Sequence, residues 1–107
     1  MPKFLLTASY TTEGVKGVAS EGGTSRRTAV EQAIGDLGGS VEAFYFAFGD
    51  DDVYVIADFP DSVTAATFSL AVNSTGALRG KVQALLLTAE ELDQAAQNVA
   101  QYRPPGG

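Results

Sequence analysis

Residues 41–61, VEAFYFAFGDDDVYVIADFPD, are the stretch that most constrains the fold of this chain. Two apolar runs, 41–48 and 53–59, flank the polar sequence Gly-Asp-Asp-Asp. Glycine and aspartate are typical turn residues and do not continue a buried strand, so the chain reverses its direction there. We therefore predict a β-hairpin with its loop at residues 49–52. This loop sets three cross-strand pairs: Phe48 with Val53, Phe46 with Val55, and Phe44 with Ala57.

Strand alternation predicts which side chains of the hairpin are buried. One face of the hairpin carries Phe44, Phe46, Phe48, Val53, Val55 and Phe59. The other face carries Ala43, Tyr45, Ala47, Tyr54, Ile56 and Asp58. Because the first face is the more apolar, we expect it to pack against helices.

Further strands are predicted at residues 3–10 and 78–87, where apolar and polar residues alternate. Their more apolar faces are also expected to meet the helices. These faces are formed by Phe4, Leu6 and Ala8 in the first strand, and by Val82, Ala84 and Leu86 in the second.

Helical segments lie between and after these strands. Residues 15–20 form one or two helical turns, which the glycines at 22 and 23 end. Ser25 is expected to cap a longer helix that ends at Gly38, and Asp61 to cap another that ends within residues 73–76. Thr88 and Glu91 form a capping box before a C-terminal helix. The expected buried stripes are Ala29, Val30, Ala33, Ile34 and Leu37 in the 25–37 helix, and Val63, Ala66 and Leu70, widened by Phe68 and Val72, in the next.

The order of elements is strand, helix, strand, strand, helix, strand, followed by an extra helix. This order predicts the α+β class and the ferredoxin-like βαββαβ arrangement, with a four-stranded antiparallel sheet. Right-handed crossovers place both main helices on one face of that sheet. We expect a single domain over residues 1–101 and a flexible tail over residues 102–107.

This topology leaves one face of the sheet without helices, which we call the open face. The side chains expected there are Leu5, Thr7, Ser9, Ala43, Tyr45, Ala47, Tyr54, Ile56, Asp58, Arg79, Lys81, Gln83, Leu85 and Leu87. An exposed apolar patch of this kind marks an interface. We therefore predict that the open face packs against the same face of a second copy, in a homodimer or a higher oligomer. The alternative is that the C-terminal helix folds over it within one chain.

Composition excludes several kinds of chemistry. The 107 residues include no cysteine and no histidine, which removes thiol chemistry, the commonest general base and the usual transition-metal ligands. The net charge of −6 argues against binding to nucleic acid. No apolar stretch is long enough for a signal peptide or a bilayer span. We expect a cytoplasmic protein with no metal, no cofactor and no membrane partner.

The candidate ligand-binding residues are polar side chains expected on the open face: Thr7, Tyr45, Tyr54, Asp58, Arg79 and Lys81. Asp58 stands in an apolar strand, where burial of its carboxylate is costly unless a cation pairs with it. We expect Lys81 or Arg79 to be that cation, in a structural ion pair across the dimer interface. The alternative is that Asp58 stays protonated or acts as a catalytic base.

Two other motifs are assigned structural roles. Asp50, Asp51 and Asp52 carry oxygens of the kind that calcium prefers, but they lack the spacing of a calcium loop, so we interpret them as a solvated turn. Residues 21–27, EGGTSRR, precede a helix and are able to hold an anion there. They lack the spacing of a phosphate loop, so we interpret them as a flexible joint capped by Ser25.

Several short motifs resemble the GYD domain family, over about residues 3–90. They are Glu13-Gly14-Val15-Lys16, Arg26, Leu37-Gly38-Gly39, Ala43-Phe44-Tyr45, Phe48-Gly49, Asp52-Val53, Pro60-Asp61, Gly76, Leu78 and Arg79. The Gly–x–aromatic–Asp pattern of that family is Gly49-Asp50-Asp51-Asp52 here, so Asp51 occupies the aromatic position. The resemblance implies a small dimeric α+β barrel of undefined biochemical role. Related barrels include cofactor-free monooxygenases, isomerases and ligand-sensing domains, and a shared fold does not fix function.

Two functions are compatible with these observations. In the first, a non-catalytic dimeric domain binds a small apolar or aromatic metabolite in a partly apolar cleft between the two sheets, or serves only in assembly. In the second, a cofactor-independent isomerase or monooxygenase acts on a small aromatic or polyketide-like substrate. Asp58 would be its base, and Arg79 or Tyr45 would stabilise an enolate. The absence of histidine and of a complete catalytic constellation favours the first.

Overall fold

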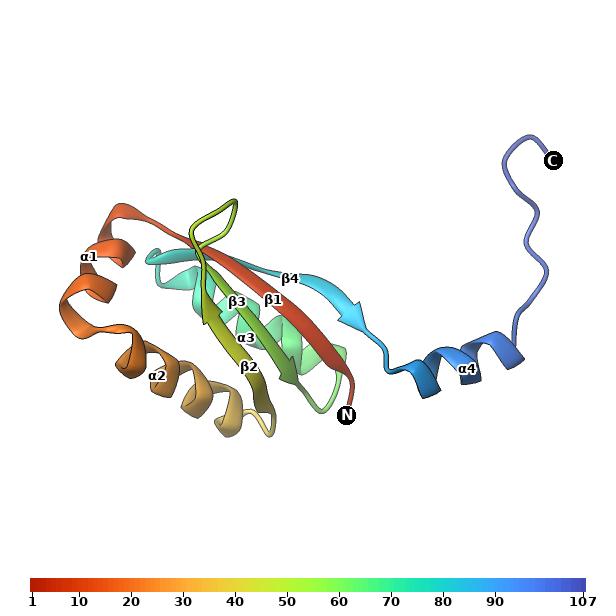
Figure 1. Cartoon of the computed structure of the whole chain (residues 1–107), viewed down its shortest axis with the longest axis horizontal. Coiled ribbons are helices and arrows are strands. Elements are labelled where there is room, and N and C mark those ends of the chain that lie inside the picture. Colours follow the sequence, from red (N-terminus) through yellow and green to blue (C-terminus); the bar gives the residue numbers. More distant parts are fainter.

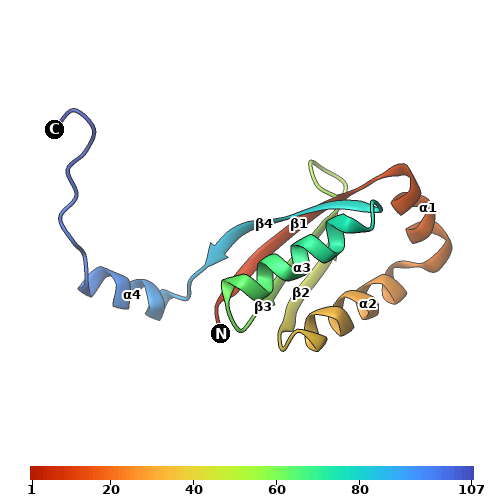
Figure 2. The same ribbon diagram turned by 180° about the vertical axis from the view of Figure 1, so that it is seen from behind.

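A computed structural model describes all 107 residues and shows one four-stranded antiparallel sheet in the order β2-β3-β1-β4 (Figure 1). The strands are β1 (Lys3–Tyr10), β2 (Ser40–Phe46), β3 (Val53–Asp58) and β4 (Leu78–Leu86). The helices are α1 (Thr12–Glu21), α2 (Gly23–Asp36), α3 (Ser62–Ser74) and α4 (Ala89–Gln97). The predicted ferredoxin-like fold, with an extra C-terminal helix, is therefore confirmed. Figure 2 shows that α2 and α3 both lie on the same face of the sheet.

The core lies between that face and the two helices. Ile34 of α2 and Phe59, which follows β3, are both 0% exposed, and the β1 and β3 residues predicted to face inward are buried with them. The ring of Phe59 packs against Phe4 and Phe68, at centroid distances of 6.1 and 5.9 Å. Apolar alternation in strands therefore predicted the sheet side of this core correctly.

The predicted buried stripe of α3 was only partly correct, because Phe68 and Val72 lie on the inward side of the helix but the other three residues do not. Val63, Ala66 and Leu70 are exposed, with Val63 and Leu70 both 73% exposed, whereas Ala65 is buried. The apolar residues of this helix are distributed around all of its sides, so its sequence alone gives no unique inward face. The orientation is fixed by tertiary packing, because Phe68 turns toward the sheet and contacts Phe59.

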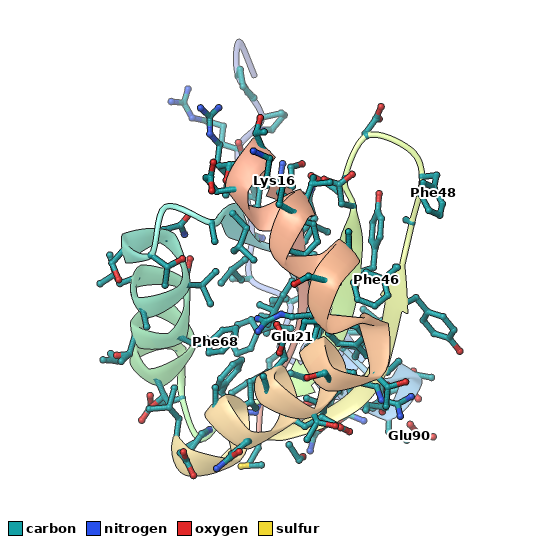
Figure 3. The ribbon with its side chains drawn as sticks, turned by 90° about the vertical axis from the view of Figure 1, so that its left-hand side faces the viewer. Lys16, Glu21, Phe46, Phe48, Phe68 and Glu90 are labelled. Atoms are coloured by element: carbon teal, nitrogen blue, oxygen red, sulfur yellow. The ribbon has the colours of Figure 1, made fainter.

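The hairpin register differs from the predicted one by two residues. Phe46 pairs with Val53 and Phe44 with Val55, so residues 47–52 form the loop and Phe48 is fully exposed on it (Figure 3). Contacts with β1 explain the longer loop, because the Tyr10 N–H donates to Asp52 Oδ2 at 2.8 Å. A shift of two residues preserves the side-chain faces, so Phe44 and Phe46 still point toward the helices.

The predicted faces of β4 are correct only in its first half. The pairing of β1 with β4 shifts register between Leu5 and Leu6, so that Leu85 lies opposite Phe4, while Ala84 lies opposite Leu5. Residues directly opposite each other share a face. Ala84 and Leu86, which were expected to meet the helices, therefore lie on the open face. The irregularity is of the kind that an extra, unpaired residue produces, and simple alternation cannot anticipate it.

Gly22 separates α1 from α2. Ser25 was predicted to be the N-cap of the second helix, but it does not occupy that position. The backbone of Gly22 has φ of 91°, a conformation that favours glycine, and its N–H donates to the carbonyl of Val18 at 2.8 Å. Helix α2 begins at Gly23, and the Ser25 hydroxyl donates instead to Glu21 Oε1 at 2.9 Å. The glycine ends one helix and begins the next, so the expected flexible joint is a single residue.

Helix α4 begins with the predicted capping box, in which Thr88 and Glu91 each bond to the backbone of the other. The helix projects away from the sheet in both views, so it does not fold over the open face of its own chain (Figures 1 and 2). None of the helices is both long enough and apolar enough to span a bilayer.

Candidate functional site

Most of the predicted site residues lie in a single row across the open face. Tyr45 of β2 pairs with Tyr54 of β3, Tyr54 pairs with Thr7 of β1, and Thr7 pairs with Lys81 of β4. Directly opposed residues have Cβ atoms about 4.5–5.5 Å apart. The fold therefore brings these four side chains together, although they come from four different strands.

Burial varies steeply along this row. Thr7 is only 2% exposed, and its hydroxyl donates to Gln83 Oε1 at 3.3 Å, whereas Tyr45 is 71% exposed. A small threonine in a central strand is covered by its larger neighbours, while a tyrosine at an edge strand is not. Thr7 is thus a polar group at the floor of the row, Tyr54 beside it is half-buried, and Tyr45 is exposed at the edge of the sheet.

The other two predicted residues lie at opposite ends of the open face. Arg79 pairs with Ser9 near the loop end of the sheet. Asp58 lies at the other end. We expected Arg79 or Lys81 to pair with it, but its partner is Lys3. Lys3 Nζ lies 3.0 and 2.9 Å from the two oxygens of Asp58 and 2.9 Å from Glu42 Oε1. Asp58 sits opposite Lys3 in the sheet register, which explains this pair.

This ion-pair group has a defined pH dependence. Hydrogen bonds to Glu42 and then to Asp58 raise the pKa of Lys3 above its usual value. A raised pKa in the folded state means that the pair stabilises the fold below the usual lysine range and is lost as the pH rises through the folded pKa. The group is therefore intact at neutral pH, where it holds the N-terminal end of β1 to β2 and β3.

A purely apolar row lies between these polar groups. Ala43 pairs with Ile56, Ile56 pairs with Leu5, and Leu5 pairs with Ala84. The open face thus has an apolar centre, flanked by the tyrosine-containing row on one side and the Lys3–Asp58 pair on the other.

A second candidate site lies on the helix side of the sheet, where sequence reasoning did not place one. An apolar hollow of about 80 Å³ lies between α2, α3 and the sheet. Its main lining residues are Leu6, Val53 and Val55 of the sheet, Val30 of α2, and Phe68 and Val72 of α3. Phe68 points from α3 into the space between the two helices (Figure 3).

A larger and more polar hollow of about 310 Å³ adjoins the first one and is bounded by α1 and the end of α3. Tyr10, Arg26, Val72 and Leu78 line both hollows, so the two meet at these residues. We call the two hollows together the helix-side cleft. Its inner part is apolar, and its outer part includes the carboxylates of Glu13 and Glu21.

Tyr10 and Arg26 are the polar groups at the junction of the two hollows. Burial raises the pKa of the Tyr10 phenol above its usual value, and the charge of the nearby Arg26 guanidinium opposes that rise. One guanidinium nitrogen of Arg26 lies 3.6 Å from Glu21 Oε2. A guanidinium has five N–H donors, so the contacts with Glu21 and Tyr10 leave further donors available. The signal in the sequence was the paired arginines in the 21–27 segment, which only the fold brings beside Tyr10.

Two of the three aspartates at 50–52 have structural partners. Asp52 accepts the backbone N–H of Tyr10, and Asp51 Oδ1 accepts the hydroxyl of Ser9 at 3.1 Å. Both carboxylates thus tie the hairpin loop to the end of β1. No group of three or more acidic residues in the structure is arranged to hold a metal ion.

Comparison with known proteins places the chain in a family. The family model for the GYD domain matches residues 4–96. The chain belongs to the GYD domain family. No curated protein and no solved structure matches this GYD domain. The biochemical role of the family is uncertain, so membership fixes the type of domain and leaves its activity open.

The motifs that carried the resemblance occupy defined places in this GYD domain. The Glu13–Lys16 motif lies in α1, where Gly14 approaches the turn between α3 and β4 closely. The motif that names the family forms the β2–β3 loop, and Asp51 at its aromatic position is bonded to Ser9. This hydrogen bond connects Asp51 to β1.

Proposed function

We propose that this GYD domain is a non-catalytic homodimeric domain that binds a small apolar or aromatic molecule, and that the open faces of two copies pack together. The observation that carries this proposal is the uncovered apolar row Ala43–Ile56–Leu5–Ala84 at the centre of the sheet. No helix of the chain covers this face. Removing such a surface from water is favourable, and a two-fold axis lets one patch serve as its own partner.

The charge on the open face supports the same arrangement. Lys3, Arg79 and Lys81 lie on it with Glu42 and Asp58, so it is close to neutral, although the chain as a whole carries −6. Two strongly acidic molecules repel each other least where the local charges balance. The open face is therefore the surface through which two copies approach at the lowest electrostatic cost.

The small molecule would lie beside the row of Tyr45, Tyr54, Thr7 and Lys81, between the two sheets. Aromatic rings with a few polar groups are typical of such sites. The ion pair of Asp58 with Lys3 supports a non-catalytic role, because it occupies both oxygens of the candidate base.

Analytical ultracentrifugation of a matched pair of variants tests the dimer. Ile56→Glu places a charge in the centre of the apolar row, and we expect it to convert the wild-type dimer to a monomer at micromolar concentration. Leu70→Glu changes an exposed apolar residue on the outer surface of α3 and should leave the dimer intact. A wild-type protein that sediments as an 11.1 kDa monomer would refute the proposal.

A further inference from the structure

We propose that the helix-side cleft is a second ligand-binding site, and that it takes a small neutral molecule with a short apolar end and a carbonyl oxygen. The inner hollow would hold the apolar end, and the carbonyl oxygen would accept hydrogen bonds from Arg26 and Tyr10. The remainder of the molecule would lie in the outer hollow. This inference goes beyond the proposed interface site and does not depend on the dimer, because the cleft is formed within one chain.

The inner hollow sets the size and polarity of the apolar end. Its walls are chiefly apolar, and its volume is about 80 Å³. An apolar cavity of about 150 Å³ holds benzene, so this hollow accommodates a group smaller than a ring, such as a short alkyl chain. The outer hollow, at about 310 Å³, is at the lower end of the usual range for ligand pockets and has room for a ring.

The junction supplies the groups that recognise a polar atom. Arg26 contributes N–H donors and Tyr10 a hydroxyl, and both line each of the two hollows. Donors that converge between an apolar pocket and an opening to solvent select a ligand with an oxygen at that point. The half-buried side chain of Arg26, 29% exposed, is already partly removed from water, which strengthens a hydrogen bond from it.

The charges of the outer hollow select a neutral oxygen over an anionic one. Glu13 and Glu21 line this hollow together with Arg26, so acidic groups outnumber the single basic group. A ligand carboxylate would be attracted to Arg26 and repelled by both glutamates, and it would compete with Glu21 for the guanidinium. A ketone carbonyl accepts the same hydrogen bonds without that repulsion.

The test is a titration of the full chain with three probes, followed by backbone-amide NMR. Butyrophenone has a propyl chain, a carbonyl and a phenyl ring; butylbenzene lacks the oxygen; and 4-phenylbutyrate carries a carboxylate. We expect saturable shifts at Tyr10, Arg26, Val72 and Leu78 with butyrophenone, and at least fivefold weaker binding of the other two. Equal binding of butyrophenone and butylbenzene would overturn the role of the carbonyl, and tighter binding of 4-phenylbutyrate would overturn the preference for a neutral oxygen.

Adjacent arginines provide a matched control. Arg26→Met removes the donors but keeps an apolar stem, and we expect it to weaken butyrophenone binding about tenfold, as the loss of one charged hydrogen bond does. Arg27→Met changes the neighbouring arginine, which does not line the cleft, and should leave the affinity unchanged. Val72→Trp should abolish binding by filling the junction. An equal effect of both arginine variants would overturn the inference.

The outcomes separate this inference from the proposed function. Saturable shifts confined to the open face, at Thr7, Tyr54 and Lys81, would refute the helix-side cleft and leave the interface site standing. Shifts in the cleft of a protein that sediments as a monomer would refute the homodimer and support the cleft. The absence of saturable shifts with all three probes would overturn the inference.

Discussion

At the scale of single residues, Gly14 shows how closely the outer wall of the helix-side cleft is packed. A Cβ atom at this position would clash with the carbonyl oxygen of Ala77 and lie 2.9 Å from Cδ1 of Tyr10. The neighbouring Thr11 hydroxyl donates to the carbonyl of Ala77 at 3.0 Å, which holds α1 against the turn before β4. Glycine is needed here for close approach rather than for an unusual backbone conformation.

Gly14→Ala should therefore destabilise the domain by about 1–3 kcal/mol, the usual cost of overpacking a tight site. Gly17→Ala, one helical turn later in α1, has open space around its added methyl group. It should stabilise the domain by about 0.5–1 kcal/mol, because alanine is the better helix former. Urea unfolding of both variants measures the difference, and a stabilised Gly14→Ala variant would contradict the assigned contact.

At the scale of elements, α3 and α4 both begin with a side-chain cap but differ in how they pack. Asp61 caps α3 by accepting the Thr64 N–H at 2.8 Å, and Thr88 caps α4 by accepting the Glu91 N–H at 3.1 Å. Helix α3 lies against the sheet and contributes Ala65 to the core, whereas α4 has no buried residue. Loss of the α3 cap should therefore destabilise the core, whereas loss of the α4 cap should not.

The Asp61 cap should also depend on pH. Hydrogen bonds from the Thr64 hydroxyl and then from its backbone N–H lower the pKa of Asp61 below its usual value. A lowered folded pKa means that the charged cap stabilises the domain above the usual carboxyl range and is lost as the pH falls through the folded pKa. We expect Asp61→Ala to lower the melting temperature at pH 7. The difference in melting temperature between this variant and the wild type should become smaller in acid.

Melting curves of Asp61→Ala and Thr88→Ala between pH 2 and pH 7 measure this effect. Thr88→Ala is the control, and it should reduce helical circular dichroism without lowering the main transition, because α4 is not packed in the core. A gap between wild type and Asp61→Ala that stays constant over the whole pH range would show that the charge of the cap is unimportant.

At the scale of the whole molecule, the chain consists of a compact body and a projecting arm. The body is formed by the sheet with α1, α2 and α3, and α4 with the residues after it extends away (Figure 1). The radius of gyration is 16.5 Å, whereas a compact domain of about 100 residues has about 13 Å. The arm thus adds length to the molecule and contributes nothing to its buried core.

Removal of residues 89–107 should therefore leave the body folded. We expect the melting temperature of the 1–88 fragment to stay within about 2 °C of the full chain, because no core residue is lost. Thermal unfolding followed by circular dichroism at matched protein concentration tests this. A fall of ten degrees or more would contradict this division, because it would mean that α4 stabilises the body.

The sequence by itself determined the elements and most of the sheet side of the core. Pro60 and Asp61 predicted the end of β3 and the start of α3, and Thr88 with Glu91 predicted the capping box of α4. Alternation predicted that Phe4, Leu6, Val53 and Val55 are buried, which the structure confirms. These features succeed because they depend on neighbours within a few residues along the chain, or on the two-residue period of a strand.

The candidate sites could be predicted only in part from the sequence. Alternation placed Thr7, Tyr45, Tyr54 and Lys81 on one face, but it could not show that they form one row, because that depends on register. The partner of Asp58 was missed for the same reason, since Lys3 and Asp58 are 55 residues apart in the chain.

Only the tertiary structure decided the hairpin register, the shift in β4, the inward face of α3 and the helix-side cleft. Each results from contacts between elements that are distant in sequence: Asp52 with the end of β1, Phe68 with Phe59, and Arg26 with Tyr10. A local pattern states which side chains are apolar. It does not state which of several similar surfaces meet, because that choice follows from the free energy of packing the whole chain.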